Sequence, residues 1–279
     1  MRQETTASIS DRYLQFCANT SPGKHTDMFD KLPTSLENIC DLIAKQLVHP
    51  WDGSPQPEGR TYEPRANQTI ENILENLKKL NKAGLVASRA LNERVIAACR
   101  ENALLLTAIL QYQNIPARAR AGWCRYISSK PEQFADHWIT EVWNASDQRW
   151  MMVDTNPKKI DFSPREFKFG GAVWLELRSG QVEPKTYRQQ ADWFYAKLNF
   201  GHDFNAVLGQ GPHYWEAPPL FHQENDQMSE DDLSILDRLA ELLQQPDTHL
   251  EAILDLQKKH RGLQGLKSAW HIFERTVYS

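Results

Sequence analysis

One hairpin-like segment constrains the fold of this 279-residue chain more than any other. The stretch ADHWITEVWNASDQRWMMVDTN, residues 135–156, contains two runs of alternating apolar residues around a polar turn, which is the pattern of a β-hairpin. His137 stands near the start of the first run and Asp154 near the end of the second, where β-branched residues would be the ordinary choice. The segment therefore predicts two antiparallel strands with a titratable side chain at the matching end of each.

The length of the turn decides how these two side chains lie. Facing residues of an antiparallel pair have position numbers with a constant sum, and they share one face of the sheet. A two-residue loop at Ala145-Ser146, or a four-residue loop over 144–147, sets His137 directly opposite Asp154, with Cβ atoms about 5 Å apart. A turn of odd length shifts the register by one and separates them. The even-length turn predicts a carboxylate that orients an imidazole and stabilises the imidazolium.

A buried helix is predicted to begin at Cys99, in the leucine-rich segment CRENALLLTAILQY. A helix N-terminus presents unpaired N–H groups and partial positive charge, which favour a thiolate and a developing oxyanion. Cys99 is therefore the candidate nucleophile, with His137 as base and Asp154 as its orienting carboxylate. Each residue alone has an ordinary explanation: a buried cysteine, a histidine at the rim of the sheet, or an aspartate that caps a turn. The functional interpretation rests on the combination.

The other helix signals lie on both sides of this region. Thr34 and Glu37 form a capping box for a helix that Pro50 ends, with Leu47 on its apolar face, and a second amphipathic helix begins at Ile70. Towards the carboxyl end, Ser229 and Thr248 are plausible helix N-caps, the latter in a capping box with Glu251.

The middle of the chain reads as one helix followed by three strands, the first of them in ARARAGWCRYI. This order predicts an α+β fold in which the candidate catalytic helix packs on an antiparallel sheet. Helical extensions are predicted at both ends. The predicted organisation is an N-terminal segment over 1–32, a core over 33–160, and a C-terminal extension over 161–279 that packs on the core.

Composition excludes several classes of protein. The net charge of −4 and the scattered basic residues argue against a nucleic-acid reader. Neither a signal peptide nor a run of about 20 apolar residues is present, so a cytoplasmic protein without a membrane partner is expected. Cys17, Cys40 and Cys124 lack metal-site spacing and are predicted to be structural thiols rather than disulfides. We expect no metal and no organic cofactor.

The motifs in combination resemble the core of the transglutaminase-like superfamily. The resemblance rests on a cysteine that opens a leucine-rich helix, IPAR before a strand, the strand DHWITEVW and the strand ending WMMVD, all within Ala98–Asn156. It is similar to a bacterial branch of these proteins, and a looser likeness continues through AVWLELRSG and DWFYAKLNFGHDF. The resemblance implies a papain-like α+β fold and a Cys–His–Asp triad at Cys99, His137 and Asp154. One departure is the pair Ala97-Ala98, where the branch usually has Gly-Asn.

Supporting roles are predicted more weakly for four residues. Trp138 and Trp123 are candidates for the walls of a substrate cleft, although tryptophans in such strands are more often core residues. Asn199 and Asp203 fall where the extension resembles the family, which makes them candidates for substrate binding. By contrast, Arg118 and Arg120 lie on one strand face, where ion pairs with Glu101 or Glu141 are favoured over substrate contacts.

The predicted function is cysteine-dependent acyl transfer or amide hydrolysis on an amide- or peptide-containing substrate, through a thioester acyl-enzyme. Hydrolysis is favoured over transfer to an amine because water is always available and no second binding module is evident. The alternative is a non-catalytic protein-binding scaffold of the same fold. A metal site at Cys99 and His137 is a third possibility, but it lacks sensible further ligands. Substrate identity, the second oxyanion donor and oligomeric state stay open.

Overall fold

The computed structural model describes residues 11–130, 132–187 and 193–270. The α-helices are α2 (Leu36–Ala44), α3 (Ile70–Leu80), α4 (Cys99–Tyr112), α5 (Gly170–Arg178), α6 (Trp193–Val207), α7 (Glu230–Leu242) and α8 (Pro246–Lys259). The strands are β1 (Leu47–Val48), β2 (Val95–Ile96), β3 (Ala117–Cys124), β4 (Ala135–Asn144), β5 (Arg149–Thr155), β6 (Lys158–Ile160), β7 (Phe167–Phe169), β8 (Glu216–Ala217) and β9 (Lys267–Ser268). Short 3-10 helices connect several of them, among them Pro64–Asn67 and Pro219–His222.

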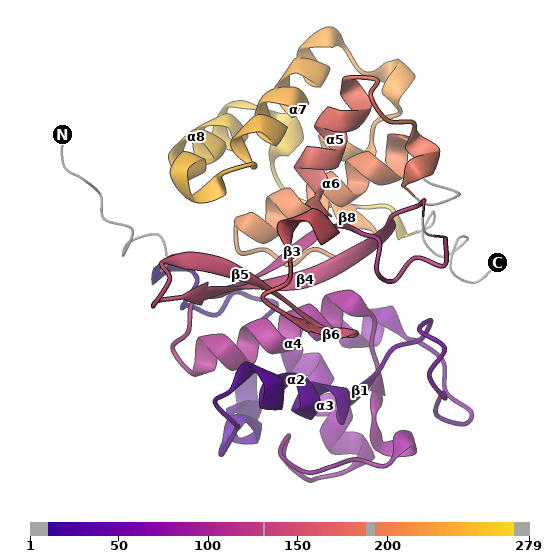
Figure 1. Cartoon of the computed structure of the whole chain (residues 1–279), viewed down its shortest axis with the longest axis vertical. Coiled ribbons are helices and arrows are strands. Elements are labelled where there is room, and N and C mark those ends of the chain that lie inside the picture. Colours follow the sequence, from indigo (N-terminus) through magenta and orange to yellow (C-terminus); the bar gives the residue numbers. More distant parts are fainter. Residues whose placement is uncertain (1–10, 131, 188–192, 271–279) are drawn as a thin grey trace. The chain divides into compact units, whose positions relative to one another are not determined.

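The main sheet contains five strands in the order β6-β5-β4-β3-β7 (Figure 1). The pairs β4–β5, β5–β6 and β3–β7 are antiparallel. Strands β3 to β6 follow one another both in the chain and in the sheet, as short connections favour. Helices together with an antiparallel sheet confirm the predicted α+β class.

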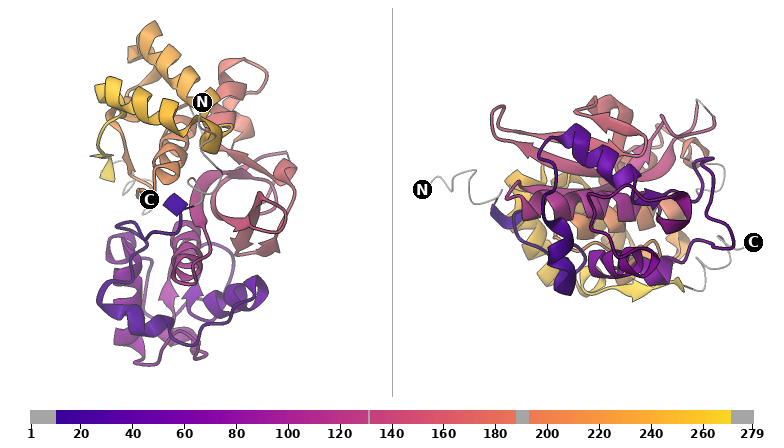
Figure 2. Two further views of the ribbon diagram at one scale, coloured as in Figure 1. Left: turned by 90° about the vertical axis from the view of Figure 1, so that its left-hand side faces the viewer. Right: turned by 90° about the horizontal axis from the view of Figure 1, so that it is seen from below.

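The described residues form two compact units. Those up to Ala119 together with Trp138–Phe162 make the first, and Arg120–His137 together with those from Ser163 onward make the second. In the first unit α4 packs against α2, α3 and β5 (Figure 1). In the second, α5 packs against α6 and α7, and α7 packs against α8 (Figure 2). The domain boundaries predicted from the sequence stay a prediction.

Helix α4 is buried almost along its whole length, as its apolar density predicts. Residues 100–111 are all buried, and Leu104, Leu105 and Leu106 are at most 1 % exposed. Helix α3 also follows its predicted pattern, with Ile70, Ile73, Leu74 and Leu77 fully buried on one face. Because α4 is packed on nearly all sides, its position within the first unit is fixed. Cys99, its first residue, therefore has a fixed place beside its neighbours.

The start and end of α2 differ from the prediction. Its N-cap is Ser35 rather than Thr34, because the Ser35 hydroxyl accepts a hydrogen bond from the Asn38 N–H at 3.3 Å. The helix ends at Ala44, and Leu47, predicted to lie on its apolar face, belongs instead to β1. Strand β1 pairs in parallel with β2, which directly precedes α4. Pairing with a strand distant in the chain overrides the local helical periodicity.

The β4–β5 hairpin forms as predicted, but its strand register is shifted by two residues from the predicted one. The loop is Ala145–Gln148, with Asn144 paired with Arg149 and Thr140 with Val153. The Asn144 side-chain oxygen accepts from the N–H groups of Ser146 and Asp147, and Gln148 has φ 52°. An Asx turn followed by a left-handed residue therefore closes a four-residue loop one position later than predicted.

The C-terminal helices confirm one of the two predicted caps. Ser229 caps α7, and its hydroxyl accepts from the Asp232 N–H. Thr248 lies inside α8, whose N-cap is Gln245 and whose first residue is Pro246, so the predicted cap at Thr248 is wrong. Proline has no N–H to lose and a pre-set φ, which favours it at a first helical position. No helix in the described part of the chain is both long and apolar enough for a bilayer crossing.

Candidate active site

Cys99 is the first residue of α4, and no N-cap side chain bonds to the start of this helix. The N-cap is Ala98, which has no side-chain oxygen for the N–H groups of the first turn. The Glu101 carboxylate instead reaches back, and its Oε2 accepts from the Ala98 N–H at 2.9 Å. Only this half of a capping box exists here. The first-turn N–H groups are therefore not used by an N-cap side chain, and an anion at Cys99 would find donors there.

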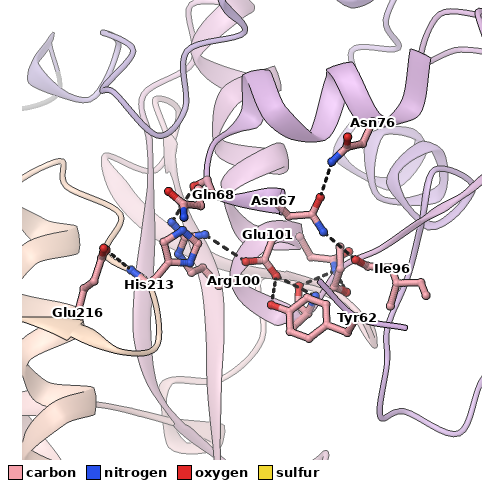
Figure 3. A network of polar contacts seen from close by, with 12 residues as sticks. Tyr62, Asn67, Gln68, Asn76, Ile96, Arg100, Glu101, His213 and Glu216 are labelled. Carbon is pink, nitrogen blue, oxygen red and sulfur yellow. Dashed lines mark hydrogen bonds and ion pairs between the residues drawn. The ribbon is translucent and has the colours of Figure 1, made fainter. Parts of the chain in front are cut away.

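A buried polar network surrounds this helix start (Figure 3). Glu101 is fully buried, and its Oε2 also accepts from the Tyr62 hydroxyl at 2.9 Å. Arg100, equally buried, donates to Glu101 Oε1 at 3.1 Å and to the Gln68 carbonyl oxygen at 3.1 Å. The carboxylate of Glu101, two residues from Cys99, disfavours ionisation of the Cys99 thiol. The guanidinium of Arg100 offsets this negative charge.

The pKa of Tyr62 links this network to Cys99. Burial raises the pKa of the Tyr62 hydroxyl well above its ordinary value, and the carboxylate of Glu101 raises it further. The charge of Cys99 acts in the same direction. The hydroxyl of Tyr62 thus remains a neutral hydrogen-bond donor within electrostatic range of the Cys99 sulfur.

The segment before Cys99 is held on two sides. The Val95 N–H donates to the Gln46 carbonyl and the Ala97 N–H donates to the Val48 carbonyl, each at 3.0 Å. From the other side the Asn67 amide donates to the Ile96 carbonyl at 3.0 Å (Figure 3). These bonds leave the chain little freedom where it enters the helix.

His137 lies in β4 and is 2 % exposed. Its ring contacts Tyr126 edge-on, with centroids 6.0 Å apart. Three residues further along the same strand, the Thr140 hydroxyl donates to the carbonyl oxygen of Ala103 at 3.0 Å. Since Ala103 lies one turn after Cys99, β4 is bonded directly to the first part of α4.

Asp154 lies in β5 and is 3 % exposed. Its Oδ1 accepts from the Asn156 N–H at 3.0 Å, as a turn aspartate would. Continuing the observed register sets His137 opposite Asn156 rather than opposite Asp154, which corrects the predicted direct pairing. Asp154 becomes the diagonal neighbour on the same face, roughly 7–8 Å away and within reach of a ring. The triad contact itself stays a prediction.

Asp154 also acts on the thiol of Cys40 in α2. Burial raises the pKa of Cys40 to about 12, Lys158 lowers it, and the carboxylate of Asp154 adds to the rise. Helix α2, which carries this thiol, packs against β5, the strand that carries the aspartate. Cys40 is therefore a thiol that does not ionise near neutral pH, in line with its predicted structural role.

The four weaker candidates are all buried, and their substrate-binding role stays a prediction. Trp138 is 2 % exposed and Trp123 is 1 % exposed. The ring of Trp123 contacts Tyr187 edge-on at 5.5 Å. Asn199 in α6 donates to the Gly122 carbonyl oxygen at 3.2 Å.

Asp203 makes a buried ion pair. Both of its oxygens accept from Arg120, from Nε at 2.7 Å and from Nη2 at 2.9 Å. The guanidinium carbon also lies 3.9 Å from the centroid of the Phe169 ring. Arg118 also makes a buried ion pair, in which its Nε donates to Glu141 Oε2 at 2.6 Å, and this confirms one of the predicted structural ion pairs. Both residues of the Arg120–Asp203 pair belong to the second unit.

Replacing Asp203 with alanine is expected to destabilise the protein by about 3–5 kcal/mol, because Arg120 would keep a buried charge without its partner. Urea unfolding of the full chain measures this free energy. The matched control is Glu241→Ala, which breaks the exposed Arg238–Glu241 pair and is expected to change stability by less than about 1 kcal/mol. Equal stabilities of the two variants would contradict a structural role for Asp203.

A pocket of about 410 Å³ lies in the first unit, lined by residues that include Arg60, Glu63, Asn67, Lys79 and Ile96. None of the three candidate catalytic residues lines it. Within the described part of the chain, no group of three or more His, Cys, Asp or Glu side chains is arranged to hold a metal ion.

The structure adds residues that the sequence did not suggest. Tyr62 lies 37 positions before Cys99 in a Pro/Gly-rich loop, and no spacing rule connects the two. Glu101 carried a usable signal, because a glutamate three positions after a helix N-cap is half of a capping box. The alanine at the N-cap obscured it.

The comparisons with known proteins fit this arrangement. Residues 54–155 match the family model of the transglutaminase-like superfamily. No curated protein matches the chain. The matched range begins inside the loop that carries Tyr62 and ends just after Asp154, so it contains all three candidate catalytic residues. The resemblance predicted from the motifs is thereby confirmed: residues 54–155 are a match to the transglutaminase-like superfamily.

Proposed function

We propose that the chain is a cysteine-dependent enzyme that acts on an amide- or peptide-containing substrate through a thioester acyl-enzyme. Cys99 is the nucleophile, His137 the general base and acid, and Asp154 the residue that orients His137. The core around them is papain-like, with α4 packed on the sheet strand that carries Asp154. Neither a metal nor an organic cofactor takes part in this scheme.

One observation supports the proposal most strongly. Cys99 begins a buried helix of 14 residues whose N-cap has no capping side chain. A serine, threonine, aspartate or asparagine at the N-cap would stabilise such a helix by about 1 kcal/mol. The helix start where a reactive anion would form lacks that stabilisation. The helix dipole and the first-turn N–H groups would then favour the thiolate and the oxyanion that follows it.

The reaction proceeds in two halves. His137 accepts the proton of Cys99, and the sulfur attacks the amide carbonyl carbon to give a tetrahedral intermediate. When the C–N bond breaks, the imidazolium gives the proton to the departing amine, and the acyl group stays on sulfur as a thioester. Water then attacks the thioester with His137 again accepting a proton, and Cys99 is released. An amine acceptor follows the same steps; hydrolysis is favoured because water reaches an acyl-enzyme without a second binding site.

Asp154 holds the imidazole and stabilises its charged form in both halves. The diagonal register supports this role, since it keeps His137 and Asp154 on one face of the sheet. The capping bond from Asn156 occupies Oδ1, which directs the carboxylate.

Alkylation of the four cysteines tests the nucleophile independently of any substrate. Iodoacetamide near pH 6 is expected to label Cys99 at least about tenfold faster than Cys17, Cys40 or Cys124, because only a thiolate reacts readily. Peptide mapping by mass spectrometry gives the rate at each site. Cys40 is expected to be the slowest, since burial raises its pKa to about 12. Equal, slow labelling at all four sites would favour a non-catalytic binding scaffold.

A positive result leads to the substrate. Incubating the full chain with a broad library of thiol-reactive amides traps the acyl-enzyme, and the mass of the adduct on Cys99 identifies the acyl group.

A further inference from the structure

Asn156 contacts two carboxylates from different parts of the chain. Its backbone N–H donates to Asp154 Oδ1 at 3.0 Å, and its side-chain Nδ2 donates to Asp52 Oδ2 at 2.8 Å. Asp52 lies more than a hundred positions earlier, in the Pro/Gly-rich loop after β1. The end of β5 is therefore tied to this loop through one asparagine.

Asp52 is itself fixed in place. The Ser54 N–H donates to its Oδ1 at 2.8 Å, which leaves Oδ2 for Asn156. Partial burial raises the pKa of Asp52, but the hydrogen bonds from Asn156 and Ser54 outweigh it and hold that pKa below its ordinary value. The loop is closed further by Gln56, whose amide donates to the carbonyls of His49 and Ser54, each at 2.9 Å. Asp52 is therefore an ionised acceptor on a well-held loop.

The same loop also reaches the start of α4. The exposed ring of Trp51 contacts the ring of Tyr62 edge-on, with centroids 5.3 Å apart. The hydroxyl of Tyr62 binds Glu101, two residues after Cys99. Two neighbouring loop residues thus make both contacts: Trp51 contacts Tyr62 of the network near Cys99, and Asp52 binds Asn156.

We propose that Asn156, held by Asp52, is a positioning residue that fixes the carboxylate of Asp154 for His137. This inference rests on the proposed function. A carboxylate with Oδ1 bonded to a fixed N–H has a set direction for its second oxygen, and a bond to an imidazole depends steeply on that direction. The backbone N–H of Asn156 is a fixed donor only if the residue itself is anchored, and its side chain supplies that anchor through Asp52.

Other charged groups surround Asp154, and they are unchanged by the variants that follow. Lys159 of β6 faces it in the strand register. Cys40 of α2 lies within its electrostatic range, and Lys158 beside it pairs with Asp41 at 2.5 Å. If replacing Asp52 or Asn156 changes the reactivity of Cys99, the cause is therefore the lost contact between Asp52 and Asn156. The other charged neighbours of Asp154 stay in place.

The test compares the pH dependence of Cys99 alkylation by iodoacetamide in the full chain and in Asp52→Ala, Asn156→Ala and the double variant. A well-aligned carboxylate stabilises the imidazolium, and the imidazolium stabilises the thiolate. Loosening Asp154 therefore moves the rise in Cys99 reactivity to higher pH. The expected result is labelling about tenfold slower near pH 6 in each single variant, with no further loss in the double variant.

The matched control is Asp147→Ala. It removes the Asn144 Nδ2–Asp147 Oδ2 bond of 3.0 Å, an asparagine–aspartate contact at the opposite end of the same hairpin. Its alkylation profile is expected to match that of the unmodified chain. Asp52 is exposed and Asn156 half-buried, so thermal unfolding of all variants is expected to change little. Asp52→Asn, which keeps an acceptor oxygen for Asn156, is expected to restore part of the reactivity.

Three results would overturn the inference, and they are distinguishable. If Cys99 of the unmodified chain is selectively reactive and both single variants keep its profile, Asn156 positions nothing and the proposed function stands. If Cys99 of the unmodified chain reacts no faster than the other cysteines, the proposed function fails and the inference falls with it. Additive losses in the double variant would show that Asp52 and Asn156 act separately, which contradicts the anchor.

Discussion

Cys99→Ala is expected to reduce turnover of any amide substrate by roughly 10⁶-fold while leaving the fold intact. The sulfur is the atom that becomes acylated, and no other side chain at the start of α4 can replace it. Stability is expected to be preserved because Cys99 is only half-buried, and alanine is a good helix former. Steady-state kinetics and a thermal unfolding curve measure the two effects separately.

Cys17→Ala is the matched control for this variant. Cys17 is also a half-buried free thiol, and its sulfur accepts a hydrogen bond from the Thr20 hydroxyl. Activity of Cys17→Ala is expected to equal that of the unmodified chain. Turnover retained in Cys99→Ala would refute the assignment of the nucleophile, whatever the control does.

Asp154→Asn is expected to lower kcat by about 10³- to 10⁴-fold and to change KM only a few-fold. The amide oxygen of asparagine still accepts the N–H of Asn156, so the turn after β5 is preserved. The negative charge is lost, and the neighbouring imidazole loses its tautomer preference and its stabilised imidazolium. A fall in kcat without a matching rise in KM is therefore the signature of an orienting carboxylate.

A turn residue would behave differently in the same experiment. The Asx bond to Asn156 is what an aspartate makes when it only caps a turn, and this explanation accounts for the observed contact equally well. Asparagine keeps that bond. If Asp154 only caps the turn, the rate of Asp154→Asn is therefore expected to be unchanged. Asp147→Asn in the hairpin loop is the control, with kcat expected to match the unmodified chain. An unchanged rate in Asp154→Asn would remove the aspartate from the proposed mechanism.

The helix that carries Cys99 was predictable from the sequence, and its burial followed from local pattern alone. Dense leucines after Cys99 require a buried helix, and the following IPAR can only end it. The hairpin was equally predictable as an element, because alternating residues and a polar turn favour no other structure. The register of the hairpin was not predictable. Four-residue loops over 144–147 and over 145–148 both have an even length, and the residue spacing does not decide between them.

The supporting residues were beyond the reach of sequence patterns. Tyr62 meets Glu101, and Asp52 meets Asn156, through loops whose path no periodicity describes. Leu47 differs from its predicted helical place for the same reason: its partner Val95 lies 48 positions away, and the pairing exists only in the folded chain. Likewise, the pairing of Arg120 with Asp203 rather than with a glutamate depends on where α6 packs.

The sequence by itself determined the helix that presents Cys99, the two strands that present His137 and Asp154, and the superfamily to which the motifs point. Those features depend on neighbours within one helix turn or one strand pair, and the spacing of residue types in the sequence predicts such contacts. Only the tertiary structure decided the pairing of Leu47 with Val95, the bond from Tyr62 to Glu101 and the loop that anchors Asn156. Each of these depends on hydrogen bonds whose geometry is set once distant segments pack, because a polar group seeks whichever partner the fold brings within reach.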